Sequence, residues 1–183
     1  ERGWVQQYHL GALRNNNSRI LKSYGHDMGC DSIGDFRQAQ SLSRFLDTLD
    51  SKNKLAKTIL YNLDPAQNAI FATMAGNFND GSMSGKIQFG ASWWFLDQLD
   101  GIRNQINTLS NMSVLSTFIG MLTDSRSFMS YPRHEYFRRV LCNIFGEDVE
   151  KGLLPRDLDT IGTIVSDICY LNAKSYFNFY SSQ

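Results

Sequence analysis

Several side chains that could do chemistry follow strand-like segments of this sequence. They are His9 and Arg14 after the first segment, Trp93 and Trp94 after the third, and Asp124 and Arg126 after the fourth. An imidazole, two guanidinium groups, two indoles and a carboxylate could together bind a metal, hold an anionic substrate and transfer protons. Such a set would work only if the fold brings the ends of the segments to one place.

The most informative of these positions follow residues 118–122, a continuous apolar run. A run of this kind is typical of a strand buried on both faces. Because an unpaired buried charge is costly, we expect Asp124 and Arg126 either to pair with each other or to face a ligand. In barrels of parallel strands, the carboxyl end of a strand is where catalytic groups stand.

Each candidate also has a purely structural interpretation. His9 could be a hydrogen-bonded histidine at a strand end, without a ligand. The two arginines could form surface ion pairs, and the two tryptophans could pack in the core or at its rim. The structural interpretation is weakest for Asp124, because a carboxylate directly after a buried strand needs a cation, a metal or a hydrogen-bond network.

The elements that would position these residues alternate along the chain. Strand-like segments cover residues 5–9, 58–63, 86–90 and 118–122. Apolar residues at helical spacing follow each of them in turn, over residues 42–49, 70–78, 99–109 and 137–145. A last helix is predicted over residues 158–176. Asp64 and Pro65 predict the start of the second helix, and Gly146 predicts the end of the fourth. This order predicts a parallel sheet covered by helices, in either a doubly wound sheet or a (β/α)8 barrel.

The length of 183 residues accommodates four such βα units. A complete (β/α)8 barrel typically needs about 250 residues, so four units would make half of one. The sequence starts with Glu1 and reaches a strand almost at once. We therefore expect residues 1–183 to be the C-terminal half of a single barrel domain in a longer chain.

Composition excludes several classes of protein. The 18 basic residues balance 18 acidic ones, so the chain lacks the positive field of a nucleic-acid-binding protein. Three widely spaced cysteines predict reduced thiols rather than disulfides or a thiolate zinc site. No membrane-spanning run, signal peptide or nucleotide-binding glycine motif is present in the sequence, which favours a cytoplasmic protein without a membrane partner.

A basic cluster near residue 135 contains the start of a zinc-protease motif. His134 and Glu135 begin the pattern H-E-x-x-H, but Arg138 occupies the position of the second histidine. We interpret Arg133, His134, Arg138 and Arg139 as the solvated face of a helix.

Taken together, these residues make the chain resemble the uronate isomerases, also called glucuronate isomerases, of the amidohydrolase superfamily. The resemblance rests on HLGALRN at 9–15, DSIGD at 31–35, KTILY at 57–61, QFG at 88–90, WWF at 93–95, MLTDSRSF at 121–128, RHEYFRR at 133–139, DIC at 167–169 and NA at 172–173. These blocks extend over nearly the whole chain.

The resemblance implies a (β/α)8 barrel in which the four predicted strands are the fifth to the eighth. It implies interconversion of D-glucuronate with D-fructuronate and of D-galacturonate with D-tagaturonate through an enediol, and a divalent metal, with zinc as the expected ion. Asp124 would be a metal ligand and proton-transfer group, with Arg126 as its catalytic partner. His9, Arg14, Trp93 and Trp94 would bind the substrate.

One departure from the family is important. The H-x-H metal pair of the first barrel strand is missing, since His9, His26 and His134 are the only histidines. The remaining metal ligands are therefore expected outside this chain, in an N-terminal half that the site requires, and a homo-oligomer is expected. Two alternatives stay open: a metal-dependent hydrolase on the same barrel, and a non-catalytic fragment that binds a sugar acid or a partner subunit.

Overall fold

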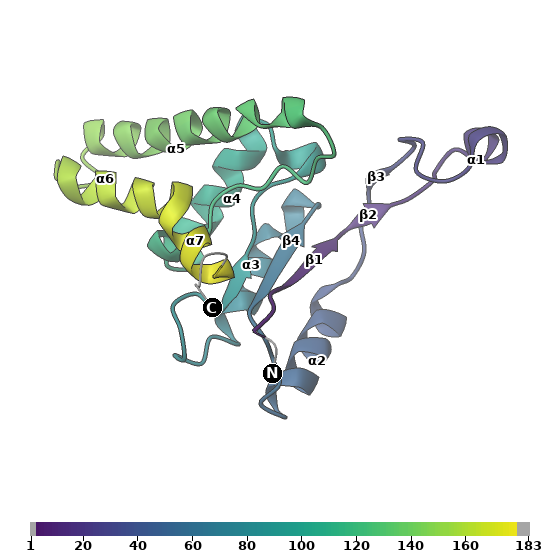
Figure 1. Ribbon diagram of the computed structural model, residues 1–183, viewed down its shortest axis with the longest axis horizontal. Helices are drawn as coiled ribbons and strands as arrows, with labels where there is room; N and C mark the ends of the chain where they lie inside the picture. The colour runs from purple at the N-terminus through teal and green to yellow at the C-terminus, as the bar shows by residue number, and fades with distance from the viewer. Residues whose placement is uncertain (1–2, 179–183) are drawn as a thin grey trace.

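The computed structural model describes residues 3–178 and has a three-stranded parallel sheet near its centre (Figure 1). The strands are β1 (Gln6–Leu10), β4 (Thr58–Asn62) and β5 (Ile87–Phe89), in the order β1-β4-β5. All of β4 is buried, whereas exposed residues alternate with half-buried ones in β1. His9 lies opposite Tyr61 in the parallel register and belongs to the exposed positions of β1. The ends of the predicted domain, residues 1–2 and 179–183, lie outside the described residues.

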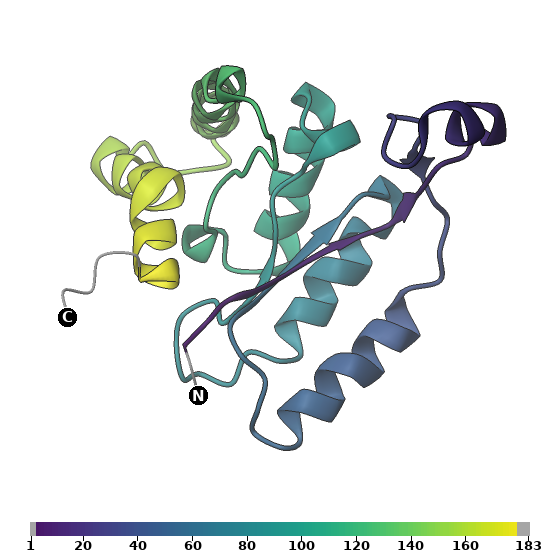
Figure 2. The ribbon, with the colours of Figure 1, turned by 45° about the vertical axis from the view of Figure 1, so that its right-hand side comes forward.

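Helices follow the strands in the predicted alternation. They are α2 (Ala39–Asp50) before β4, α3 (Asn68–Gly76) between β4 and β5, α4 (Leu99–Met112) after β5, and then α5 (Pro132–Glu150), α6 (Leu158–Ser166) and α7 (Asn172–Phe177). In Figure 2, α2 and α3 run side by side along the sheet, and α3 also contacts α4. The core between these layers contains Leu46, Ile59, Leu60, Phe71, Ile102 and Ile106. None of the helices within residues 3–178 has the length and apolarity needed to cross a lipid bilayer.

Helical structure after β4 begins at Pro65 as predicted, but its first turn is a 3-10 helix rather than α3 itself, and the predicted buried face is displaced. The Asp64 carboxylate accepts from the backbone N–H of Ala66, in a short 3-10 helix at Pro65–Gln67 that precedes α3. Ile70, expected on the buried face, is exposed, whereas Phe71 is fully buried. Because α3 packs against the sheet and also against α4, its buried surface is wider than one apolar stripe.

The fourth predicted strand is not formed. Residues 118–120 are buried as expected, but residues 118–122 pair with no strand in the described chain. Gly120 has a φ of +79°, which turns the backbone out of the extended conformation. Side chains replace the backbone ladder here, because Gln88 donates to the Thr117 carbonyl (3.0 Å) and Asn172 donates to the carbonyls of Ser116 (2.7 Å) and Phe118 (2.8 Å).

Two predicted helix boundaries also differ. Helix α5 continues through Gly146 to Glu150, because a glycine inside a helix costs only about 1 kcal/mol. The helix expected over 158–176 is divided into α6, a π-helical turn at Asp167–Leu171, and α7. The π-helical turn lies directly before Asn172, whose side chain donates to the backbone of the buried segment that follows α4.

The long connection after β1 forms an arm that extends away from the rest of the molecule (Figure 1). Its base is a short antiparallel pair of β2 (Ala12–Leu13) and β3 (Ser32–Ile33), and its tip carries α1 (Ser18–Tyr24). The Asn17 side chain caps α1, which has no buried residue. The arm is therefore ordered by turns and caps rather than by a core, and it carries Arg14.

Candidate active site

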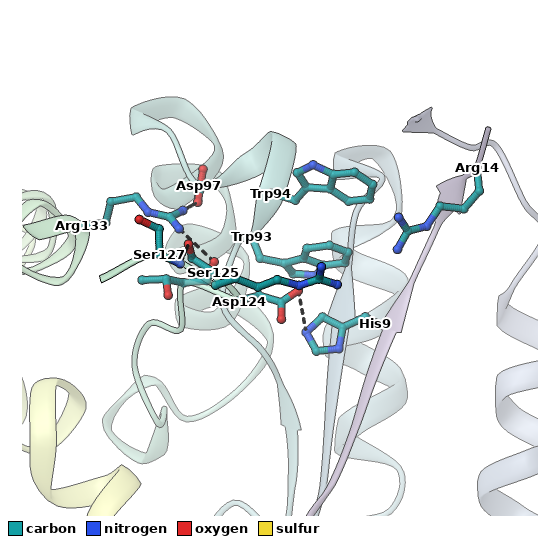
Figure 3. Close-up of a pocket in the computed structure, with 11 residues that line it drawn as sticks. His9, Arg14, Trp93, Trp94, Asp97, Asp124, Ser125, Ser127 and Arg133 are labelled. Atoms are coloured by element: carbon teal, nitrogen blue, oxygen red, sulfur yellow. Dashed lines mark hydrogen bonds and ion pairs between the residues drawn. The ribbon is translucent and has the colours of Figure 1, made fainter. Parts of the chain in front are cut away.

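All six residues singled out from the sequence line one pocket, with a volume of about 640 Å³ (Figure 3). They are His9, Arg14, Trp93, Trp94, Asp124 and Arg126, and the pocket is completed by Asp97, Thr123, Ser125, Ser127 and Arg133. The carboxyl end of β1, the arm, the residues that follow β5, residues 123–127 and the start of α5 supply these groups. The structure thus brings the predicted residues together, while the role of each stays a prediction.

His9 is held between aromatic rings on the sheet side of the pocket. Its imidazole stacks on Tyr61 at a centroid distance of 4.5 Å and meets the edge of Trp93 at 4.8 Å. Burial lowers the pKa of His9, although the nearby Asp124 carboxylate opposes this shift. Burial also raises the pKa of the Tyr61 phenol, which donates a hydrogen bond to the Gln7 side chain. Both rings are therefore predominantly neutral at pH 7.

Asp124 lies across from His9, with 3.8 Å between the carboxylate Oδ2 and the imidazole Nε2 (Figure 3). Its φ of +46° lies in the left-handed region, which costs a non-glycine residue about 1 kcal/mol or more. Half of the Asp124 side chain is exposed. A neutral imidazole does not balance the carboxylate charge, so Asp124 can still attract a cation or a proton from a ligand.

Arg14 reaches the pocket from the arm and is held by two carboxylates. Its Nη1 lies 2.9 Å from Oδ2 of Asp31, whose side chain is 3% exposed, and 3.5 Å from Oδ1 of Asp27. Its guanidinium carbon lies 5.0 Å from the ring centroid of Trp94. Because Arg14 is already paired, it presents an oriented guanidinium rather than an unpaired charge.

Arg126 differs from Arg14. It is exposed, and within residues 3–178 no carboxylate lies in ion-pair distance of its guanidinium. Asp124 and Arg126 do not pair with each other within the described chain, and both are exposed rather than buried, so the premise of two buried charges is wrong. That they face a ligand stays a prediction. Arg126 is the more available of the two predicted arginines for an anionic group.

In the view of Figure 3, the two tryptophans lie between Arg133 on one side and Arg14 on the other. Their rings are stacked 5.4 Å apart with an interplanar angle of 14°. Trp93 is 4% exposed, and its indole N–H is buried without an acceptor among the described residues. Trp94 has a φ of +56°, so a second residue of the pocket is held in the left-handed region. Strain of this kind persists where the surrounding structure imposes it, often at functional sites.

The sequence interpretation missed Asp97 and assigned Arg133 wrongly to a solvated helix face. Arg133 forms an ion pair through Nη1 with Asp97, and its Nη2 donates to the Thr123 carbonyl (3.1 Å) and to Ser130 Oγ (3.2 Å). Burial raises the pKa of Asp97, against the effect of Arg133. One signal was available, because a cation in the first turn of a helix opposes the helix dipole and so indicates a partner elsewhere.

The donors that could hold a metal are incomplete within this chain. His9 Nε2 and Asp124 Oδ2 are both atoms that zinc accepts, and they converge on one point of the pocket. A zinc site needs at least three protein ligands, however, and residues 3–178 contain no cluster of three or more His, Cys, Asp or Glu side chains suited to a metal. The described residues alone therefore do not fit a complete site.

Comparison with known proteins gives a consistent result. A sequence model of the family described as glucuronate isomerase matches residues 1–177. The uronate isomerase of Flavobacterium johnsoniae is 64% identical over 179 residues, and that of Bacteroides fragilis is 61% identical over 180. Each alignment covers 98% of this chain and 38% of the relative, so the chain spans little more than a third of these proteins.

A solved structure agrees with the sequence comparisons. The crystal structure of uronate isomerase from Thermotoga maritima superposes with a TM-score of 0.84 at 37% sequence identity. The superposition covers 96% of this chain and 37% of the Thermotoga chain. The described fold therefore corresponds to 37% of a larger chain of known structure.

Proposed function

The chain belongs to the glucuronate isomerase family, and from this premise we propose that it is part of an enzyme that interconverts aldose and ketose uronates. The proposed reactions are D-glucuronate to D-fructuronate and D-galacturonate to D-tagaturonate. One observation carries the proposal: Asp124 faces His9 at 3.8 Å across a pocket that Arg14 and Arg126 also line.

The proposal includes a complete (β/α)8 barrel. The three strands and residues 118–122 would be its fifth to eighth strands, and the N-terminal half would close the barrel against β1. The match to little more than a third of the Thermotoga chain supports this arrangement. The exposed positions of β1, Gln7 and His9, would then face the barrel interior. We expect the described portion to be inactive without that half.

Aldose-ketose isomerisation moves a proton between two adjacent carbons through an enediol. The site must therefore provide a base near carbon and must stabilise negative charge on oxygen. The exposed carboxylate of Asp124 would accept the proton from one carbon and return it to the next. Arg126, which has no carboxylate partner within the described chain, would balance charge that develops on the substrate oxygens.

The other pocket residues would bind and orient the sugar. Arg14, oriented by Asp31, suits bidentate binding of the uronate carboxylate. The buried indole N–H of Trp93 is a donor that a substrate oxygen could satisfy. Neutral His9 can donate or accept a hydrogen bond next to Asp124. These contacts would place the two reacting carbons beside the carboxylate.

A divalent metal, with zinc as the first candidate, is part of the proposal. Asp124 would supply one ligand, and the remaining ligands would come from outside this chain. Such an ion, when bound, polarises carbonyl and hydroxyl oxygens. Metal content of the purified full-length protein, measured by mass spectrometry, tests this without reference to activity.

The experiment that tests the function is a coupled dehydrogenase assay on the full-length protein, with D-glucuronate and D-galacturonate as substrates, before and after chelation. The proposal predicts turnover of at least one uronate and loss of turnover on chelation. A parallel series of ester and amide substrates provides the control. Hydrolysis of those substrates without isomerisation would assign the site to a hydrolase instead.

A further inference from the structure

We propose that Arg133 is a positioning residue that fixes Asp124 relative to the two tryptophans by joining the segment after β5 to the segment that carries Asp124. This proposal rests on the proposed function, which makes Asp124 the proton-transfer group. From the sequence alone, Arg133 is most simply interpreted as part of a solvated helix face.

The first reason is that the Asp124 segment has little support of its own. The hydrogen bonds from Gln88 and Asn172 reach only as far as Phe118. Within residues 3–178, the backbone from 119 to 124 then receives one hydrogen bond, from Arg133 Nη2 to the Thr123 carbonyl. That carbonyl belongs to the peptide unit that leads into Asp124. The bond from Arg133 therefore acts directly next to a residue held at a φ of +46°.

The second reason is that the same guanidinium also holds Asp97, in the segment that carries the two tryptophans. Asp97 is the C-cap of the short 3-10 helix Trp94–Leu96, whose first residue is the second of the two tryptophans. Its carboxylate pairs with Nη1 of Arg133, and the two side chains are only 15% and 33% exposed. Figure 3 shows Arg133 reaching both Asp97 and the segment of Asp124 from the side of the pocket opposite Arg14. One planar group thus sets the distance between the segment that carries the tryptophans and the segment that carries Asp124.

The third reason is chemical. A guanidinium presents several N–H donors in a rigid fork, whereas an ammonium is a compact charge on a flexible stem. Arg133 uses separate nitrogens for Asp97 and for Thr123, with Ser130 Oγ as a further acceptor. A lysine at this position could keep the charge but could not contact both Asp97 and the Thr123 carbonyl in the same geometry. Because Asp97, Thr123 and Ser130 engage both terminal nitrogens of Arg133, its role is to place Asp124 rather than to bind the substrate.

The test uses four variants of the full-length protein: Arg133→Met, Arg133→Lys, the double variant Arg133→Met with Asp97→Asn, and Arg139→Met. The methionine keeps the length of the side chain and removes the fork. The double variant also removes the carboxylate that Arg133→Met would leave half-buried and unpaired. Arg139→Met is the matched control, because Arg139 lies on the same helix, is 75% exposed and pairs only with Glu135 within the described chain.

Two measurements are made on each variant. The first is kcat and KM for uronate isomerisation. The second is the rate at which trypsin cleaves the native protein after Arg126, followed by mass spectrometry, which reports the mobility of the Asp124 segment without using activity. Thermal unfolding of each variant provides the measure of stability.

We expect Arg133→Met to lower kcat on the order of 10- to 100-fold with little change in KM, since small misplacement of a catalytic group has effects of this size. Cleavage after Arg126 should become at least several-fold faster. Arg133→Lys should show the same defects, because charge alone does not restore the fork. The double variant should recover thermal stability but neither kcat nor resistance to trypsin, and Arg139→Met should match the wild type.

Recovery of kcat together with stability in the double variant would overturn the proposal, because Arg133 would then merely neutralise Asp97. An unchanged kcat or an unchanged cleavage rate in Arg133→Met would overturn it as well. If the wild-type protein isomerises neither uronate, the proposed function fails, while the cleavage rates still decide whether Arg133 holds the segment.

Discussion

The two walls of the pocket are built in different ways. On the sheet wall, His9 extends from a parallel strand whose neighbour β4 is completely buried, and its ring is stacked on Tyr61. On the loop wall, Asp124 lies in a segment that forms no strand in the described chain and has left-handed backbone at Gly120 and at Asp124 itself. Backbone hydrogen bonds hold the first wall, whereas single side chains hold the second.

This difference predicts where the site is vulnerable. A ladder distributes its stability over many backbone groups, so one side-chain change removes little of it. A segment held by Asn172, Gln88 and Arg133 loses a large share of its support with each substitution. We therefore expect substitutions on the loop wall to alter geometry and activity more than equally conservative ones on the sheet wall.

The largest effect is expected for Asp124→Asn in the full-length enzyme. The amide cannot accept the proton from carbon, and loss of a general base typically lowers rates by about 10² to 10⁴. The side chain is half exposed, so unfolding should be little affected. Isomerase kcat with D-glucuronate and thermal unfolding measure the two properties. Asp50→Asn, at an exposed position in α2, provides the control, and unchanged turnover of Asp124→Asn would refute the assignment.

The next largest effect is expected for Gly120→Ala. A Cβ there would lie 2.3 Å from the backbone oxygen of Ile168, at a φ of +79°. The overlap and the left-handed conformation together should lower the free energy of unfolding by about 3 kcal/mol. Gly146→Ala is the matched control: its Cβ would meet no atom within 4 Å, so this change in α5 should stabilise by about 0.5–1 kcal/mol. Equal effects of the two changes in urea unfolding would contradict the described loop wall.

A smaller loss is expected for Asn172→Ala. The change leaves the carbonyls of Ser116 and Phe118 without their side-chain donor next to the core, which should cost about 2 kcal/mol. Urea unfolding measures the loss, with Asn104→Ala at an exposed position of α4 as the control. If both variants unfold at the same urea concentration, side-chain hydrogen bonds do not hold the segment.

The smallest expected effect is the contribution of His9, on the sheet wall, to the pH dependence of stability. Burial lowers the pKa of His9 in the folded protein, so below pH about 6.5 the unfolded chain binds a proton at this position more readily. Stability should therefore fall as pH decreases from 7.5 to 5.5, and His9→Asn should make this dependence shallower. Urea midpoints at several pH values test the sign. An equal or steeper dependence in the variant would show that His9 is not held neutral by its ring contacts.

The sheet wall could be predicted from sequence because local patterns determine it. Residues 5–9, 58–63 and 86–90 have the composition of strands, and Asp64 with Pro65 marks the helix that follows the second of them. The convergence of His9 and Trp93 follows from the rule that carboxyl ends of parallel strands meet at one edge. That inference needed only the local composition of the segments and this general rule for parallel strands.

The loop wall could not be predicted in the same way. The apolar run 118–122 has the composition of a buried strand, yet its burial comes from contacts with helices near Phe137 and Ile168, and Gly120 interrupts its extension. Arg133 and Asp97 lie 36 residues apart, so no local spacing links them. The relation between these residues exists only once α5 is packed beside the segment after β5.

By itself, the sequence determined the first three strands and the helices between them, the family, and the six side chains gathered at one pocket, because periodicity and motif order depend on neighbours along the chain. Tertiary structure alone decided that Asp124 stands in a left-handed turn opposite a neutral histidine, that Arg14 is paired while Arg126 is not within the described chain, and that Arg133 joins Asp97 to the segment of Asp124. Those properties depend on the burial of side chains and on distances between residues that are remote in sequence. Both are set only when the helices pack against one another and against the sheet.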